Sequence, residues 1–143
     1  MDAKGRLSVP AFIRQKVERR SDEKVLVLSV HPEFQCLLGY DANHSAAMHD
    51  RAEKRLGDNP DPFAELEMQA GLFAGTVDVP YDTSGRIIMP PRLKRRAGIE
   101  DLALFIGMGG EFQVWNPQVA LESESRFLRD LAADLLDERK AAA

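Results

Sequence analysis

The chain has 143 residues, of which 44% are hydrophobic, and this size and composition fit one globular domain or two very small ones. No apolar run approaches the roughly 18 residues that a transmembrane helix needs. Cys36 is the single cysteine. It excludes an internal disulfide and indicates a reducing compartment, so we expect a cytoplasmic protein.

Charge is distributed unevenly along the chain. The net charge of -4, taken alone, argues against a nucleic-acid partner. However, residues 2–20 and residues 82–98 each carry a net charge of +4, which leaves -12 on the remainder. Two basic patches on an acidic body can attract a polyanion whatever the total charge is.

The first forty residues predict a turn, a strand, a helix and a hairpin. In DAKG (2–5), Asp at the first position and Gly at the fourth favour a type I turn. LSV (7–9) predicts a strand that Pro10 ends, and AFIRQKVERR (11–20) predicts a short basic helix. VLVLSV (25–30) and EFQCLLGY (33–40) are β-rich runs separated by HP, a spacing typical of hairpins.

A helical segment follows. DANHSAAMHDRAEKRLG (41–57) predicts a helix with an Asp41 cap and an end at Gly57. The breaker DNPDP then precedes a second helical stretch, FAELEMQAGLF (63–73).

The remaining residues predict a second β-rich unit and a long helix. The expected strands are AGTVDVPY (74–81), IIM (87–89), LALFIG (102–107) and EFQVW (111–115), with a turn at DTSG (82–85) and a basic helix, RLKRRAG (92–98), that Gly98 closes. Asn116 caps a final helix that Pro117 starts and that we expect to reach about residue 140. One face of this helix carries an apolar stripe, which we expect to contact the core or a partner. The stripe consists of Phe127, Leu128, Leu131, Leu135 and Leu136.

An internal repeat organises the chain. A shift of eighty aligns Asp2, Gly5, Arg6 and Pro10 with Asp82, Gly85, Arg86 and Pro90. A shift of seventy-eight aligns the two hairpins, where Glu-Phe-Gln recurs at 33–35 and 111–113. Two copies of one unit are therefore present. The expected fold class is α+β, with units at 1–43 and 73–118, a helical connector at 44–72, and a C-terminal helix and tail at 119–143.

The duplicated phrases DAKGRLSVP and DTSGRIIMP, each followed by a short basic helix and an EFQ hairpin, resemble the MraZ transcriptional regulators of the AbrB/MazE-like swapped-hairpin superfamily. The resemblance spans nearly the whole chain. It implies two tandem, pseudo-duplicated swapped-hairpin β-barrel modules in one subunit and ring-like homo-oligomers. It also implies binding to repeated sites in the promoter of the bacterial division and cell-wall gene cluster, hence a nucleoid-associated protein.

The start of the chain departs from the family pattern. Members usually carry about ten residues before the first such phrase, with a strand that pairs across the hairpin, whereas here only Met1 precedes Asp2. We expect that the start is truncated or was assigned to an internal Met.

Arg6 and Arg86 directly follow the turn glycines, so each side chain extends from a rigid hairpin tip. A guanidinium there can bind a phosphate or the N7 and O6 atoms of guanine, or it can form an ion pair with Asp2 or Asp82 and hold the turn. Lys4 stands at the first tip, where a phosphate contact or a solvated side chain is expected.

The two short helices carry the denser basic clusters. Such runs are often solvated faces, yet matched basic residues in two repeats can also follow phosphates additively. The DNA-binding candidates on these helices are Arg14, Lys16, Arg92, Lys94, Arg95 and Arg96. Arg19 and Arg20 extend the first cluster.

Metal and enzyme functions are not favoured. His44 and His49 are five residues apart, which is not the spacing of one helix face, so surface or turn histidines are expected, and Cys36 is expected to be buried and inert. No nucleophile elbow, phosphate loop or HExxH phrase occurs. We predict a DNA-binding transcriptional regulator with no cofactor, metal, membrane or small-molecule substrate. The alternative is an antitoxin-like protein-interaction module.

Overall fold

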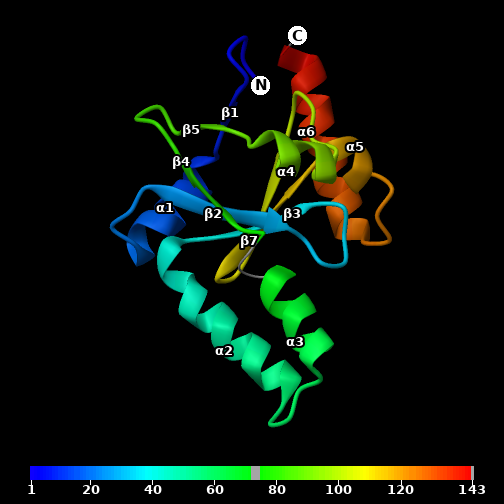
Figure 1. The fold of residues 1–143 in the computed structure, drawn as a ribbon. Helices are drawn as coiled ribbons and strands as arrows, with labels where there is room; N and C mark the ends of the chain where they lie inside the picture. Colours follow the sequence, from blue (N-terminus) through cyan, green and yellow to red (C-terminus); the bar gives the residue numbers. More distant parts are fainter. Residues whose placement is uncertain (72–74, 143) are drawn as a thin grey trace.

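The computed structural model describes residues 1–71 and 75–142, and within them the protein is an α+β structure with two antiparallel sheets (Figure 1). The elements of the first unit are β1 (Arg6–Ser8), α1 (Ala11–Arg20), β2 (Val25–Val30) and β3 (Leu37–Tyr40). Those of the second unit are β4 (Val77–Pro80), β5 (Arg86–Ile88), α4 (Pro91–Ala97), β6 (Leu104–Met108) and β7 (Glu111–Trp115). The predicted α+β class is confirmed.

The two units interlock through their strands. The larger sheet has the order β4-β2-β3-β7-β6, and all of its neighbours are antiparallel. β4 of the second unit pairs with β2 of the first, with Leu26 opposite Val79, and β3 pairs with β7. The smaller sheet is a two-stranded ribbon of β1 and β5, with Leu7 opposite Ile87. Strands of one unit therefore complete the sheets of the other.

The expected β-barrels are not seen as closed barrels. Within the described residues, the strands form two separate sheets. β4 and β6 lie at opposite edges of the larger sheet, and no hydrogen-bonded ladder joins them.

The most extensive hydrophobic cluster of the described residues serves both units. It includes Leu7 and Ile87 from the ribbon, and Ile13 and Leu93 from α1 and α4, both 0% exposed. Burial of a Leu or Ile side chain contributes roughly 1.5–3 kcal/mol. Because the repeat-related residues Ile13 and Leu93 lie in the same cluster, the two units share this core.

The connector forms a helical arm. Asp41 caps a short 3₁₀ helix (Ala42–His44), and α2 (Ser45–Leu56) and α3 (Pro62–Gln69) then project away from the sheets (Figure 1). Gly57 ends α2 with a φ of 75°, as its position after the last apolar residue predicts. The ends of the predicted helix 63–73 and strand 74–81 fall partly on residues 72–74, which lie outside the described residues.

The prediction of a single C-terminal helix is wrong. α5 (Pro117–Ala120) starts as expected, with the Asn116 side chain accepting from Gln118 N, but a break precedes α6 (Arg126–Ala142). The Ser125 hydroxyl accepts from Leu128 N at 3.2 Å, so a new helix start competes with continuation of the old one. Phe127, expected in the apolar stripe, is 74% exposed.

The strand predicted at 33–40 begins only at Leu37. His31 Nδ1 accepts from the backbone N–H groups of Glu33 and Phe34, both at 3.1 Å, and this side-chain bonding replaces the strand ladder. Burial lowers the pKa of His31. Cys36 is fully buried at the end of this loop, and burial raises its pKa to about 12, as expected for an inert thiol.

None of the helices in residues 1–71 and 75–142 is long and apolar enough to cross a membrane.

Candidate nucleic-acid interface

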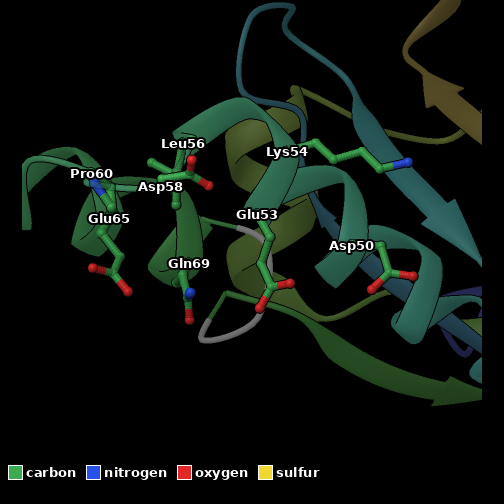
Figure 2. Close-up of a pocket in the computed structure, with 9 residues that line it drawn as sticks. Asp50, Glu53, Lys54, Leu56, Asp58, Pro60, Glu65 and Gln69 are labelled. Atoms are coloured by element: carbon green, nitrogen blue, oxygen red, sulfur yellow. The ribbon is translucent and has the colours of Figure 1, made fainter.

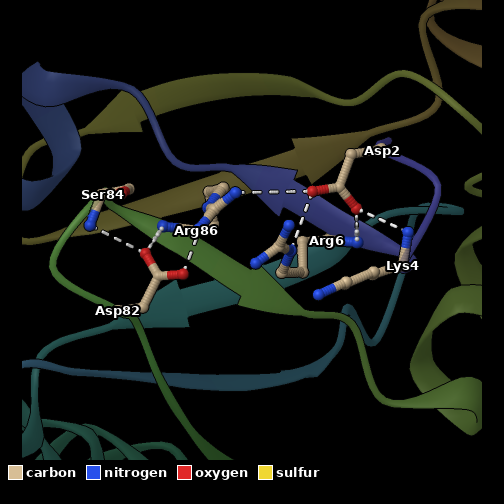
Figure 3. A network of polar contacts seen from close by, with 6 residues as sticks. All are labelled: Asp2, Lys4, Arg6, Asp82, Ser84 and Arg86. Atoms are coloured by element: carbon tan, nitrogen blue, oxygen red, sulfur yellow. Dashed lines mark hydrogen bonds and ion pairs between the residues drawn. The ribbon is translucent and has the colours of Figure 1, made fainter.

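The first tip (residues 2–5) and the second tip (residues 82–85) flank the β1–β5 ribbon (Figure 3). Because side chains alternate along a strand, Leu7 and Ile87 enter the core, while Arg6 and Arg86 lie on the opposite face of the ribbon. Antiparallel pairing places Arg86 opposite Ser8, two residues from Arg6. The two arginines of the repeat thus share one outward surface, which we call the ribbon face (Arg6, Ser8, Arg86 and Ile88).

The two tips have the same backbone geometry. Asp2 Oδ1 accepts from Lys4 N at 3.0 Å and from Arg6 N at 2.8 Å. Asp82 Oδ1 accepts from Ser84 N and Arg86 N, both at 2.9 Å. Gly5 N and Gly85 N donate to the carbonyl oxygens of Asp2 and Asp82. The turn chemistry that the repeat predicts is therefore present in both copies.

These contacts favour the ionised form of the two aspartates. The backbone N–H of Arg6 is the main cause that lowers the pKa of Asp2, and the backbone N–H of Arg86 does the same for Asp82. Donors that point at a carboxylate favour its charged form. Each tip is thus held by an anion at physiological pH.

The arginine side chains are braced by the same carboxylates. Arg6 Nε lies 2.8 Å from Asp2 Oδ2, and Arg86 Nε lies 3.1 Å from Asp82 Oδ2. Arg86 Nη1 also lies 3.6 Å from Asp2 Oδ2, so Asp2 connects the two units (Figure 3). An Nε contact uses one of the five N–H donors of a guanidinium, so bracing the side chain and binding an external acceptor are compatible.

The basic residues of the two short helices occupy different environments. Lys94 is half-buried, and its Nζ lies 3.7 Å from Met1 Sδ. Lys16 is also half-buried. The exposed candidates are Lys4, Arg92, Arg95 and Arg96. Arg14 packs against the second tip and donates from Nε to Val9 O at 3.1 Å, so it does not extend freely into solvent.

A polar network outside the tips was not predicted. Asp41, 3% exposed, lies 3.2 Å from Arg20 Nε, which ties the end of the first basic helix to the connector. His44 was expected at the surface or in a turn, but it is buried, with Nε2 3.4 Å from Glu111 Oε1. Arg51 Nη1 contacts the same oxygen at 2.5 Å. Because these contacts join segments far apart in sequence, no local pattern indicates them.

A hollow of the described surface lies between α2 and α3, away from the tips (Figure 2). Its volume is about 580 Å³. Its charged lining residues are Asp50, Glu53, Lys54, Asp58 and Glu65. Four carboxylates against one ammonium disfavour a nucleic-acid contact here, so the ribbon face remains the better candidate.

Comparisons with known proteins identify the family of the chain. The family model described as "MraZ protein, putative antitoxin-like" matches residues 72–128. The "Transcriptional regulator MraZ" of Gluconobacter oxydans is 32% identical over 145 residues, which cover 99% of this chain and 85% of that protein. The chain belongs to the MraZ family.

Other members show the same extent of similarity. The MraZ regulator of Rhodospirillum rubrum is 33% identical, with 88% of this chain and 80% of that protein covered. The one from Coxiella burnetii strain RSA 493 is 32% identical, with 80% and 73% covered. These relatives are named as transcriptional regulators, which places the chain in a non-enzymatic family.

Proposed function

We propose that the chain is a transcriptional regulator that binds double-stranded promoter DNA through the ribbon face. The observation that carries this proposal is the position of Arg6 and Arg86, one from each unit, on one outward surface. Both guanidiniums are braced by a carboxylate in the same way. A preorganised guanidinium loses little freedom on binding, which suits recognition of a planar acceptor pair.

The chemistry of this surface suits a base edge in the major groove. A two-stranded ribbon fits that groove, and arginine pairs with the N7 and O6 atoms of guanine. We assign base contacts to the tip arginines. Phosphate contacts are assigned to the basic side chains around them, namely Lys4, Lys16, Arg92, Lys94, Arg95 and Arg96.

We further propose that the operator consists of short repeated elements in the promoter of the division and cell-wall gene cluster, and that the protein acts on the nucleoid in the cytoplasm. Family membership together with the duplicated tips supports this proposal. Repeated elements suit a ring-like homo-oligomer, in which successive subunits present the same tip in the same sense.

We also propose that residues 1–43 and 73–118 are tandem swapped-hairpin modules, with a connector at 44–72 and a C-terminal segment at 119–143. The pairing of β4 with β2 supports this arrangement, because a strand of the second unit joins the hairpin of the first.

A second candidate function is an antitoxin-like interaction with another protein. An apolar hollow of about 310 Å³ lies between the second hairpin and α6. Its lining includes Phe34, Met108 and Phe127, which are 54%, 53% and 74% exposed. Exposed apolar clusters of this kind commonly mark protein contacts.

Titration on DNA separates the two functions. The chain is titrated with promoter DNA that carries the repeats and with a scrambled sequence, each at two salt concentrations. We expect tighter binding to the repeats, with affinity for both DNAs falling as salt increases. Equal affinity for the two DNAs, or no binding at low salt, would contradict DNA recognition and favour the protein-interaction function.

A further inference from the structure

We infer that Arg14 and Glu18 of α1 are positioning residues that hold the second tip in its DNA-binding conformation. We call this pair the α1 clasp. The inference rests on the proposed function and removes Arg14 from the set of phosphate contacts. It predicts that a residue of the first unit controls how the second unit recognises DNA.

Arg14 covers the turn glycine of the second tip. A Cβ built on Gly85 would lie 2.5 Å from Arg14 Nε and 2.6 Å from Arg14 Cζ, so the guanidinium lies directly against the Gly85 backbone. The same guanidinium donates to Val9 O at 3.1 Å, and Val9 N donates to Gly85 O at 2.8 Å. Arg14 is thus hydrogen-bonded to the residue that follows β1, while it packs on the turn that precedes β5.

Glu18 holds the residue that precedes the same tip. Its Oε1 accepts from the Tyr81 hydroxyl at 3.0 Å, and Tyr81 is only 8% exposed. Burial, followed by the hydrogen bond to Glu18, raises the pKa of Tyr81 to about 12, so the hydroxyl remains a donor. Residues four apart share one helix face, so Arg14 and Glu18 contact both ends of residues 81–85 from one surface.

The first tip has no equivalent clasp in the described residues. Lys94 and Gly98 occupy the positions that correspond to Arg14 and Glu18, and Met1 corresponds to Tyr81. Lys94 Nζ contacts Met1 Sδ instead of the turn, and nothing lies within 4 Å of a Cβ built on Gly5. The clasp therefore distinguishes two turns that are otherwise alike.

The clasp restrains the backbone directly before Arg86. Arg86 follows Gly85 directly, so restraint of Gly85 limits the directions that the Arg86 guanidinium can take. Recognition of a base edge depends on this direction, whereas an ionic contact with a phosphate tolerates a wider range. Loss of the clasp should therefore reduce sequence preference more than general affinity.

Two variants test this inference in the full chain. Arg14→Lys keeps the charge but removes the planar group that covers Gly85. Lys94→Ala removes the charge at the corresponding position of the second unit. We expect Arg14→Lys to weaken binding to the repeats by about tenfold, with the salt slope and the affinity for scrambled DNA unchanged. Lys94→Ala should weaken binding to both DNAs alike. If Arg14→Lys binds the repeats as wild type does, Arg14 is a simple cation and the inference is wrong.

Amide hydrogen exchange supplies a readout that needs no DNA. Arg14→Lys and Tyr81→Phe should accelerate exchange at Ser84 and Arg86, while exchange at Lys4 and Arg6 stays unchanged. If the wild-type chain prefers the repeats and the variants show unchanged exchange at the second tip, the clasp is wrong. A wild-type chain without such a preference instead overturns the proposed function.

Discussion

The first and second tips share one turn geometry but differ in what packs against them. Asp2 and Asp82 accept equivalent backbone N–H groups and brace equivalent arginines. Nothing lies within 4 Å of a Cβ built on Gly5, whereas Gly85 is buried under Arg14. The comparison shows that a repeated motif specifies a turn, while residues outside the motif determine how firmly that turn is held.

The residues that precede the two tips also have different partners. β4 leads into the second tip and pairs with β2, and Tyr81 N donates to Lys24 O. At the related position of the other unit, Met1 N donates to Asp101 O. The outer edge of β6 carries no paired strand within the described part of the chain. The second tip thus follows one paired strand, β4, and precedes another, β5.

The largest effect should come from the core that the two units share. Ile13→Ala and Leu93→Ala, equivalent in the repeat, should each lower the free energy of unfolding by about 2–5 kcal/mol. Both side chains are 0% exposed in one cluster, so each variant should unfold in a single transition. Thermal unfolding monitored by circular dichroism and calorimetry checks this. Two separate transitions would show that the units are independent.

Substitution of the turn glycines compares the tips directly. Gly5 and Gly85 have φ angles of 75° and 77°, so alanine is strained at both positions, at a cost of about 1 kcal/mol. At Gly85 the new Cβ also displaces Arg14, which should raise the loss of stability to about 2 kcal/mol. Urea unfolding measures both losses. In an Arg14→Ala background the excess at Gly85 should disappear, and an excess that persists would contradict the clasp.

The exposed arginines of α4 should affect affinity without sequence preference. Arg95→Ala and Arg96→Ala should each weaken binding to repeated and scrambled DNA by the same factor and lower the salt slope by about one per phosphate contact. Lys54→Ala, in the acidic hollow between α2 and α3, is the matched control and should change neither quantity. A larger loss for the repeats than for scrambled DNA would show that α4 contacts bases.

Protonation of Asp2 and Asp82 at acidic pH should weaken the hydrogen bonds that hold both tips. The effect on global stability should be small because both aspartates are exposed. The folded pKa of each aspartate lies below its ordinary value of 3.8. Their stabilising contribution is therefore complete above about pH 5 and is lost as the pH falls through the lowered pKa. Exchange at Ser84 and Arg86, extrapolated to a common intrinsic rate, should accelerate over this acidic range. Asp82→Asn should remove this pH dependence at the second tip alone.

The sequence predicts the features that depend on nearby residues. The DxxG turns, the bounds of α1 and β2, and the end of α4 at Gly98 follow from turn chemistry, hydrophobic periodicity and capping. The Ser125 cap was also visible as a serine three residues before Leu128, and it could have indicated the break between α5 and α6.

The remaining features depend on contacts between distant segments. The pairing of β4 with β2 and the shared ribbon face require the two units to be placed together. Arg14 lies in a basic cluster of the kind that contacts DNA. Only its proximity to Gly85 shows that its guanidinium packs against the turn. His44 likewise obtains its partner Glu111 through folding, so its environment could not be assigned from spacing.

The most direct test of the account is a binding profile in which each base pair of one repeat is changed in turn and measured with wild type, Arg86→Ala and Arg6→Ala. We expect Arg86→Ala to cost about 1–3 kcal/mol and to abolish preference at one guanine, while other positions keep their rank. Arg6→Ala, at the less restrained tip, should reduce affinity with a smaller loss of preference. Equal losses at every position for both variants would contradict the central claim that the second tip recognises bases.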